Sequence, residues 1–276
     1  MGRLRKQFAH LNPHLPSEAI EDAVARLQNL EGGLTSRNRQ FHKYLRNGVT
    51  VEYSRDGEEI GDIARLVDFE NADNNDWLAV NQFSILGPTI DGRTHTRRPD
   101  IIIFLNGLPI AVLELKNPAK EKTDIWAAFQ QLQTYKEQIP DLFETNEILV
   151  IADGATARFG SLTAAASRMM HWRIIEGHSL DPLGPHKETK TLVRGLFRRD
   201  VLLRYLRDAI LIDEQAELVK EMFARVAGGA SVRSIGALAH SVVIEAVYPE
   251  NGEGLRITLK PPFTVNQSVQ YFTTYR

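Results

Sequence analysis

The feature that most constrains this chain is a pair of apolar runs that meet at Asn106-Gly107. Residues 101–105 (Ile-Ile-Ile-Phe-Leu) and 108–113 (Leu-Pro-Ile-Ala-Val-Leu) are rich in β-branched and aliphatic side chains. An Asn-Gly pair readily takes the positive φ angles that a tight turn needs. The pattern therefore predicts a β-hairpin whose two strands are largely buried.

Three charged residues, Asp100, Glu114 and Lys116, lie on these strands, although a buried charge is costly unless it is paired or binds a metal. Side chains two residues apart share a face, so Glu114 and Lys116 point the same way. A two-residue loop in continuous register would put Asp100 on the other face. We therefore predict a three-residue loop, 105–107, with a G1 bulge, which pairs Asp100 with Val112 and places all three charges together.

Two carboxylates and one ammonium on a single face suit a metal site. Carboxylate oxygens are the ligands that Mg²⁺ and Mn²⁺ prefer, and these ions usually keep several waters and meet a substrate phosphate in the same shell. The lysine would orient or polarise the attacking water. The hairpin thus predicts hydrolysis of a phosphate ester.

The same residues resemble the PD-(D/E)xK nuclease signature, which here reads Pro99-Asp100, thirteen intervening residues and Glu114-x-Lys116. Together with Asn106-Gly-Leu-Pro, they also resemble the amino-terminal nuclease region of type I restriction endonuclease R (motor) subunits. This resemblance implies catalytic roles for Asp100, Glu114 and Lys116. It implies Mg²⁺, with Mn²⁺ as a substitute, on Asp100, Glu114 and the backbone carbonyl of Leu115.

The fold that the resemblance implies is α/β. Its restriction-endonuclease-like core has a mixed central β-sheet flanked by helices, followed by a smaller C-terminal α+β extension. We expect early helices at 17–30 and 36–46, and strands at 49–53, 63–69 and 77–86. An apolar run at 147–152 predicts a buried strand parallel to 112–115, with a neighbouring strand at 155–159.

A helix is predicted over residues 123–139, ending before Pro140. Gln131 and Tyr135 lie four residues apart on one face of it. This pair resembles the Gln-x-x-x-Tyr motif of RecB-like nucleases, which supports the catalytic lysine and contacts DNA. The later segment Phe159-Gly-Ser-Leu-Thr also resembles R subunits.

Several other residues have both a structural and a functional interpretation. Glu18 and Glu21 of the early helix can join a metal site or be solvated. Asp68 and Glu70, before the hairpin, can be acids close to the metal ligands or turn residues. Gln82 can hydrogen-bond near the site. Arginines can contact phosphates or form ordinary surface charge, and a basic helix is predicted near 198–210. The arginines that could contact phosphates are Arg158, Arg168 and Arg173, and those of the basic helix are Arg198, Arg199, Arg204 and Arg207.

The amino-acid composition limits the classes of function that the chain can have. The chain is 43% hydrophobic and 25% charged with a net charge of −2, as in an ordinary soluble domain, although residues 186–207 hold seven Lys/Arg against two acids. The absence of cysteine excludes disulfides, thiol catalysis and zinc-thiolate sites. No run approaches the roughly 18 apolar residues of a membrane span. We expect a cytoplasmic protein without a membrane partner.

A Pro- and Gly-rich stretch between 177 and 190 predicts a boundary, which divides the chain into a nuclease domain, 1–180, and a C-terminal helical linker and extension, 181–276. A hairpin is expected between 241–248 and 255–260. The phosphate-binding loop of an ATP motor does not occur in the sequence, so ATP would act only through a motor region not present in this chain. The chain is then a fragment of a longer subunit or a product that has lost its motor.

The leading hypothesis is a type I site-specific deoxyribonuclease, a Mg-dependent endonuclease that hydrolyses phosphodiester bonds of double-stranded DNA. By resemblance the full enzyme cuts after ATP-driven translocation, with methylation and specificity subunits as partners. Two alternatives stay open: a DNA-docking or assembly module that does not cleave, and a free-standing RecB-like nuclease.

Overall fold

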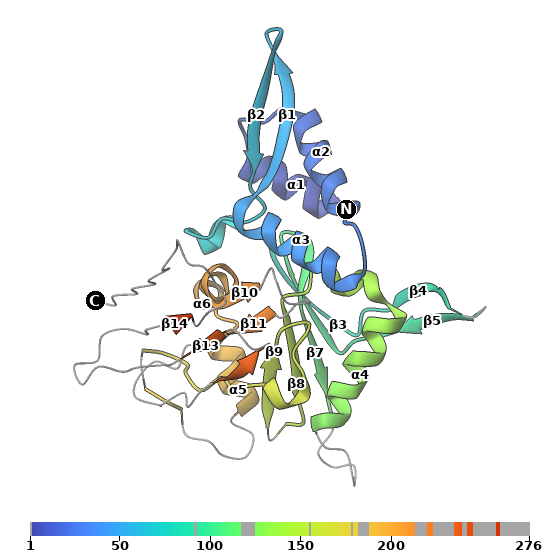
Figure 1. Ribbon diagram of the computed structural model, residues 1–276, viewed down its shortest axis with the longest axis vertical. Coiled ribbons are helices and arrows are strands. Elements are labelled where there is room, and N and C mark those ends of the chain that lie inside the picture. The colour runs from blue at the N-terminus through green and yellow to red at the C-terminus, as the bar shows by residue number, and fades with distance from the viewer. Residues whose placement is uncertain are drawn as a thin grey trace.

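A computed structural model gives the architecture of the chain (Figure 1). It describes residues 2–90, 93–116, 125–154, 156–177, 179–181 and 188–212, and four short strands beyond them, 220–222, 235–238, 242–244 and 258–259. None of the helices in these ranges is both long and apolar enough to cross a membrane.

The centre of the molecule is a five-stranded mixed sheet in the order β3-β6-β7-β8-β9. Neighbouring strands are antiparallel except for β7 and β8, which are parallel as predicted. Helix α4 connects these two parallel strands. The elements are β3 (Trp77–Asn81), β6 (Ile101–Leu105), β7 (Leu108–Leu115), α4 (Ile125–Gln138), β8 (Ile148–Ala152) and β9 (Ala157–Gly160).

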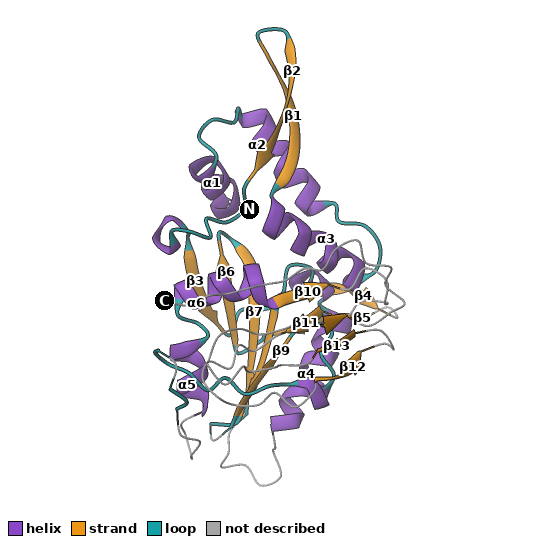
Figure 2. Cartoon of the chain, turned by 60° about the vertical axis from the view of Figure 1, so that its left-hand side comes forward, coloured by secondary structure: helices purple, strands orange, loops and turns teal. Residues whose placement is uncertain are grey.

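Alternating residues of the sheet form a separate core on each face, as the period of a strand requires. On one face Ile102, Val112 and Leu149 pack with α4 and with η2 (Pro140–Phe143). On the other face Leu113 and Val150 belong to a larger cluster with the remaining helices. The fold is therefore the predicted mixed α/β sheet flanked by helices (Figure 2).

The N-terminal part of that larger cluster comes from α1 (Gly2–Leu11), α2 (Ser17–Gln28) and α3 (Leu34–Asn47). A separate two-stranded ribbon, β1 (Val49–Arg55) and β2 (Glu58–Ala64), rises from α1 and α2 and projects away from the central sheet (Figure 1). We expected a strand over 63–69, but the strand that pairs with β1 ends at Ala64. After it, Leu66 and Val67 are buried without forming a strand.

A second ribbon, β4 (Ile85–Ile90) and β5 (Arg93–Arg97), lies between β3 and β6 in sequence. The predicted continuous strand 77–86 is wrong, because the backbone leaves the sheet at Gln82, whose φ is +48°. Two separate strands, β3 and β4, therefore replace one long strand. The β4–β5 hairpin extends sideways next to α4 (Figure 1).

The chain returns to the sheet through α5 (Glu188–Gly195), α6 (Arg199–Arg204) and a π-helical turn, Tyr205–Ala209. Their buried leucines belong to the same cluster as Leu113 and Val150, so this segment packs on the sheet. The division into domains at residue 180 stays a prediction. Farther along, β13 (Val242–Ile244) pairs with β14 (Thr258–Leu259), within the hairpin expected at 241–260. The other short strands are β10 (Ile210–Ile212), β11 (Lys220–Met222) and β12 (Ile235–Leu238).

Candidate active site

The hairpin β6–β7 carries the candidate site, and its turn differs from the prediction. Leu105 pairs with Leu108, so the loop is the two-residue Asn106-Gly107 turn, with φ angles of +54° and +83°. The expected three-residue loop with its G1 bulge is wrong. The Asn106 side chain donates to the carbonyl of Leu66 at 2.7 Å and accepts from the N–H of Asp76, which holds the tight turn.

The bulge lies two residues farther along β7. Phe104 pairs with Pro109, but Ile103 pairs with Ala111, which leaves Ile110 without a partner on β6. The extra residue changes the parity of the ladder. Ile101 then pairs with Leu113, so Asp100 comes to the face of Glu114. The grouping that we predicted occurs, although through a different pairing.

The two carboxylates meet where β6 begins and β7 ends. Asp100 Oδ2 accepts a hydrogen bond of 2.8 Å from the backbone N–H of Leu115. Glu114 shares the α4 face of the sheet with Val112, and only 2% of its surface is exposed. Asp100 is half-buried and lies nearer to solvent. The pair thus presents one buried and one accessible carboxylate.

Lys116 connects this pair to helix α4. Its Nζ lies 3.1 Å from Glu114 Oε1 and also donates to Gln131 Oε1. The amide nitrogen of Gln131 in turn donates to the hydroxyl of Tyr135. The four-residue spacing of Gln131 and Tyr135 thus places both side chains over the end of β7.

Burial and, to a lesser extent, the nearby charge of Asp100 together raise the pKa of Glu114 to about 7, against the opposing effect of Lys116. Its second oxygen, Oε2, is buried and has no hydrogen-bond partner among the described residues. A buried carboxylate oxygen without a donor is an unfavourable arrangement that a cation would relieve. The donor set therefore fits a hard divalent ion.

No third Asp, Glu or His completes a metal-binding group within the described ranges. The predicted ligands at this place are the two carboxylates and the backbone carbonyl of Leu115. Mg²⁺ commonly binds through one or two carboxylates and keeps waters in its shell, so the small number of protein ligands agrees with this ion.

Arg97 is a residue of this site that the sequence did not single out for a role. Its guanidinium donates to Gln138, at the end of α4. Burial raises the pKa of Tyr135, the charges of Glu114 and Asp100 also raise it, and the charge of Arg97 opposes them. Arg97 is therefore part of the electrostatic surroundings of the site. Its place in Arg97-Arg-Pro-Asp, directly before Asp100, is the signal that could have identified it.

The other acids are used in the fold away from this site. Glu21 pairs with Arg5, and Glu18 is exposed on the same helix, α2. Asp68 accepts from the backbone N–H groups of Glu70 and Asn71 in a turn. Gln82 is exposed, but its backbone N–H donates to the carbonyl oxygen of Asp100 at 2.8 Å.

Most of the arginines that we considered as phosphate ligands have partners within the chain. Arg158 binds Glu188, and Arg173 binds the carbonyl oxygen of Asp181. The basic helix predicted near 198–210 is formed by α6 and the π-helical turn that follows it, and its arginines bind acids of its own segment or of the segment that precedes β3. These ion pairs are Arg198–Asp200, Arg204–Asp200, Arg207–Asp208, Arg207–Glu70 and Arg199–Asp73. Their charge serves packing between segments.

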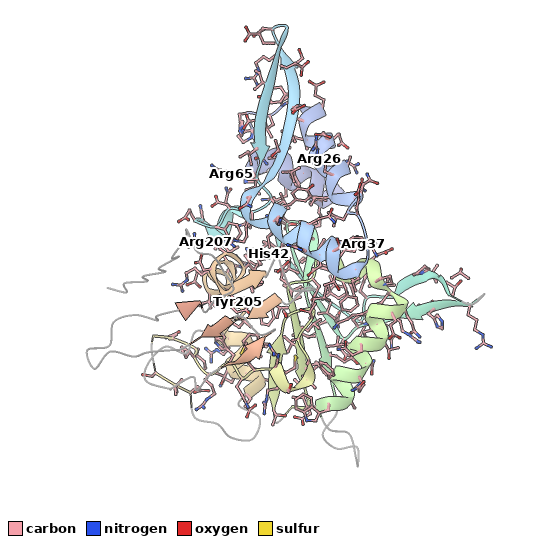
Figure 3. The ribbon with its side chains drawn as sticks, viewed as in Figure 1. Arg26, Arg37, His42, Arg65, Tyr205 and Arg207 are labelled. Carbon is pink, nitrogen blue, oxygen red and sulfur yellow. The ribbon has the colours of Figure 1, made fainter. Side chains whose placement is uncertain are left out.

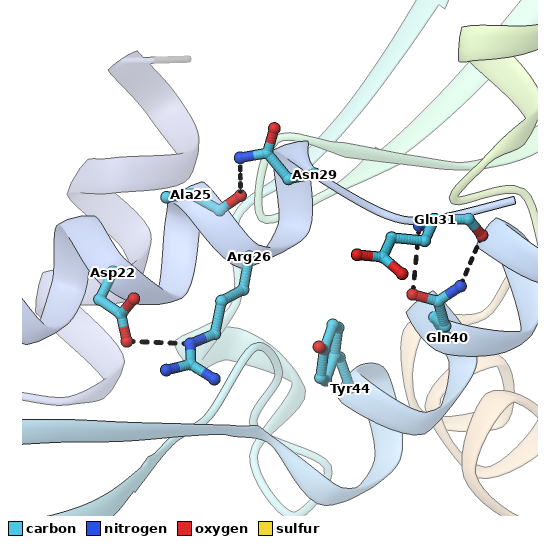
Figure 4. A pocket seen from close by; sticks show the side chains of 7 residues that line it. All are labelled: Asp22, Ala25, Arg26, Asn29, Glu31, Gln40 and Tyr44. Carbon is cyan, nitrogen blue, oxygen red and sulfur yellow. Dashed lines mark hydrogen bonds and ion pairs between the residues drawn. The ribbon is translucent and has the colours of Figure 1, made fainter.

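A hollow of about 510 Å³ lies elsewhere, between α2 and α3 (Figure 4). Its polar side chains bind each other or nearby backbone: Arg26 binds Asp22 at 2.9 Å, and Gln40 binds both backbone groups of Glu31. None of the candidate site residues lines it.

Comparison with known proteins adds a family to this geometry. The family model described as "Type I restriction enzyme R protein N terminus" matches residues 1–168. The type I restriction enzyme HindI endonuclease subunit of Haemophilus influenzae is 41% identical over 216 residues, which are 78% of this chain and 20% of that subunit. The putative MjaIXP endonuclease subunit of Methanocaldococcus jannaschii is 31% identical over 230 residues, 78% of this chain and 22% of that subunit.

The EcoprrI endonuclease subunit of Escherichia coli is 26% identical over 230 residues, which are 79% of this chain and 67% of that relative. The chain spans about a fifth of the length of the HindI and MjaIXP subunits. The family match covers the N-terminal helices, the central sheet and every residue of the candidate site. The chain therefore belongs to the family of type I restriction enzyme R proteins, as their amino-terminal region.

Proposed function

We propose that this region is a metal-dependent endonuclease that hydrolyses phosphodiester bonds of double-stranded DNA. The observation that supports this most is the joint position of Asp100, Glu114 and Lys116 on the α4 face of the sheet, with Lys116 bound to Gln131. One accessible carboxylate, one buried carboxylate and a positioned ammonium are the groups that metal-assisted phosphate hydrolysis needs.

Asp100 and Glu114, with the carbonyl of Leu115, would hold Mg²⁺ or Mn²⁺. The ion, when bound, supplies a Lewis acid for the phosphate and lowers the pKa of a water molecule. The buried Oε2 of Glu114, which has no hydrogen-bond partner in the part of the chain that the structure describes, supports this assignment. The hydrogen bond from the N–H of Leu115 fixes the Asp100 carboxylate.

Lys116 orients the reacting groups. An ammonium has three N–H donors, and here two of them go to Glu114 and Gln131. The third is left for a water or a phosphate oxygen. In the reaction a water oxygen bonds to phosphorus, the bond to one ester oxygen breaks, and a proton reaches the leaving oxygen. The fixed ammonium stabilises the negative charge that develops on the phosphate.

The names of the relatives describe endonuclease subunits of type I restriction enzymes. We infer that the whole enzyme here also contains methylation and specificity subunits, and that ATP-driven translocation precedes cutting. The chain's own residues then supply the cleavage centre.

Plasmid nicking with Mn²⁺ tests the proposal. The chain should convert supercoiled plasmid to nicked circles, and Lys116→Ala should reduce the rate at least about a hundredfold, which is the scale of losing one positioned charged group. Equal nicking by both chains would assign the activity to a contaminant or to another site.

Metal binding gives an independent readout. Titration calorimetry with Mn²⁺ should give a single site in the unaltered chain, and Asp100→Asn and Glu114→Gln should each weaken it. Lys116→Ala is the matched control, because it leaves both carboxylates in place. Unchanged affinity in both carboxylate variants would exclude the assigned ligands.

A further inference from the structure

We propose that the β4–β5 hairpin is a DNA-contacting ribbon that binds the phosphate backbone of the duplex beside the candidate active site, with Arg93 on β5 and Arg98 just after β5 as phosphate ligands. This inference rests on the proposed function, which makes DNA the substrate. It assigns a binding surface to a part of the chain that is separate from the carboxylates and from Lys116.

Both ends of the hairpin are close to the candidate metal ligand Asp100. On its entering side, β3 ends at Asn81, which pairs with Ile101, and the next residue, Gln82, donates its backbone N–H to Asp100 O at 2.8 Å. On its returning side, β5 ends at Arg97, and only two residues separate it from Asp100. A nucleic acid that contacts this ribbon therefore lies next to the scissile site.

The base of the ribbon is fixed on helix α4. Arg97 donates to the side chain of Gln138, and a Cβ atom at Gly87 would collide with the carbonyl oxygen of Gln138. Only glycine allows β4 to lie this close to the helix end. Farther out, the hydroxyls of Thr89 and Thr94 lie 3.1 Å apart across the two strands. The ribbon is thus attached to the helix that also positions Gln131 and Tyr135.

The charge of the ribbon is suited to a polyanion. Residues 82–99 contain three arginines and one histidine against a single acid, Asp91, which lies outside the described residues. Arg93 and Arg98 are exposed, and neither forms an ion pair with any residue that the structure describes. The arginines of α6, in contrast, have acidic partners. Exposed cations without partners are available to phosphates.

The shape and the remaining side chains favour a duplex over an acidic protein surface. A two-stranded antiparallel ribbon has the width that the major groove of B-DNA admits. Thr94 and Thr96 are exposed hydroxyl donors on the same strand as Arg93, and such side chains commonly bind phosphate or sugar oxygens. In Figure 1 the ribbon projects beyond α4, so a long rod-shaped ligand can reach it.

Fluorescence anisotropy with a labelled 20-base-pair duplex tests the proposal. The full chain carries Lys116→Ala, so that the DNA stays intact, and the Kd is measured between 50 and 200 mM salt. R93Q/R98Q should lower the slope of log Kd against log salt by about 1.8, because each lost phosphate contact removes about 0.9. R93K/R98K, which keeps both charges, should retain the slope.

A matched double variant removes two exposed arginines elsewhere, Arg46 on α3 and Arg65 just after β2. Figure 3 labels Arg65. Arg46→Gln/Arg65→Gln should keep the slope of the parent. An unchanged slope in R93Q/R98Q, an equal fall in both double variants, or no measurable binding by the parent would overturn the proposal. If the slope falls as expected while the unaltered chain does not nick plasmid with Mn²⁺, the ribbon stands and the proposed function fails.

Discussion

The backbone N–H of Glu147 donates a hydrogen bond to the carbonyl oxygen of Ile110, and the two atoms lie 2.8 Å apart. Ile110 is the bulged residue of β7, and it has no pairing partner on β6. The residue just before β8 therefore satisfies a backbone group that the bulge would otherwise leave without a donor. The bulge that brings Asp100 to the face of Glu114 is thus stabilised from the neighbouring strand.

Deletion of Ile110 should restore a continuous ladder and turn Asp100 to the face opposite Glu114. The variant is expected to lose Mn²⁺ binding in calorimetry while keeping a cooperative thermal transition at a lower Tm. Ile110→Val is the control, because it keeps the bulge and costs about 0.5–1.5 kcal/mol. Mn²⁺ affinity equal to that of the parent after the deletion would show that the register does not assemble the site.

Alanine substitutions at Gly107 and Gly57 distinguish the energetic cost of backbone strain from that of steric crowding. Both have a φ of +83°, but a Cβ at Gly57 meets open space, whereas one at Gly107 would lie 2.9 Å from the backbone nitrogen of Leu4. Gly57→Ala should lower the free energy of unfolding by about 1 kcal/mol. Gly107→Ala should cost at least about 1 kcal/mol more, because α1 must also shift. Urea unfolding measures both, and equal losses would contradict the close approach of α1.

His42 and Glu147 are hydrogen-bonded deep in the larger core, with Nδ1 and Oε2 2.9 Å apart and exposed side-chain fractions of 3% and 0% (Figure 3 labels His42). His42→Ala removes this partner from a fully buried carboxylate and is expected to cost about 3–5 kcal/mol of unfolding free energy. The exposed pair Arg26–Asp22 is the comparison, and Arg26→Ala should cost only about 0.5 kcal/mol. Similar losses from the two variants in chemical denaturation would be the contrary result.

Burial lowers the pKa of Lys136 to about 8, although its Nζ donates to the carbonyl of Leu162 at 2.6 Å. Between pH 8 and the ordinary lysine value of 10.5, the unfolded chain binds more protons at this residue than the folded chain does. The unfolding free energy should therefore rise with pH in this window, by up to about 1.4 kcal/mol per pH unit, and the titration of Lys136 should add no pH dependence below it.

Lys136→Met should remove that rise when denaturation curves at pH 7.5, 8.5 and 9.5 are compared. Lys190→Met removes one charge from an exposed position and reports the general effect of losing a lysine. A Lys136→Met profile parallel to that of the unaltered chain would place the titration elsewhere.

Tyr135→Phe should slow Mn²⁺-dependent nicking about 10- to 100-fold, the range typical of groups that orient a catalytic side chain. The phenol hydroxyl receives the amide N–H of Gln131, and without it the amide can turn away from Lys116. The affinity for Mn²⁺ should stay the same, since the carboxylates are unchanged. Loss of nicking together with loss of Mn²⁺ binding would indicate a collapsed site rather than a misplaced lysine.

The sequence predicted the hairpin, its charged residues and the helix after it, because the signals are local. Asn106-Gly107, alternating apolar residues and a four-residue spacing each act over a few positions. The position of the bulge was not predicted, because it depends on the hydrogen bond between the backbone of Ile110 and the residue before β8. Pro109 was the available signal, because proline lacks the N–H of a strand ladder and is common near bulges.

The arginines illustrate a second limit. Arg199 pairs with Asp73 and Arg207 with Glu70, residues more than one hundred positions away in the chain. Charge counted along the sequence cannot show such pairing, because it arises only when α6 packs beside that distant segment. The sequence predicted the basic helix near 198–210, but whether its arginines remain available for DNA depends on tertiary structure.

The β1–β2 ribbon has a consequence for solubility. It is a two-stranded sheet, and no other strand among the described residues pairs with it, so both rows of outward backbone groups can pair with a second molecule. Exposed acids line it, Glu52 on one strand and Glu58 and Glu59 on the other. Repulsion between like charges opposes the stacking of one ribbon on another. The acidity of this segment thus opposes aggregation. Replacing the three glutamates by threonine would leave an exposed strand edge that pairs readily with other molecules.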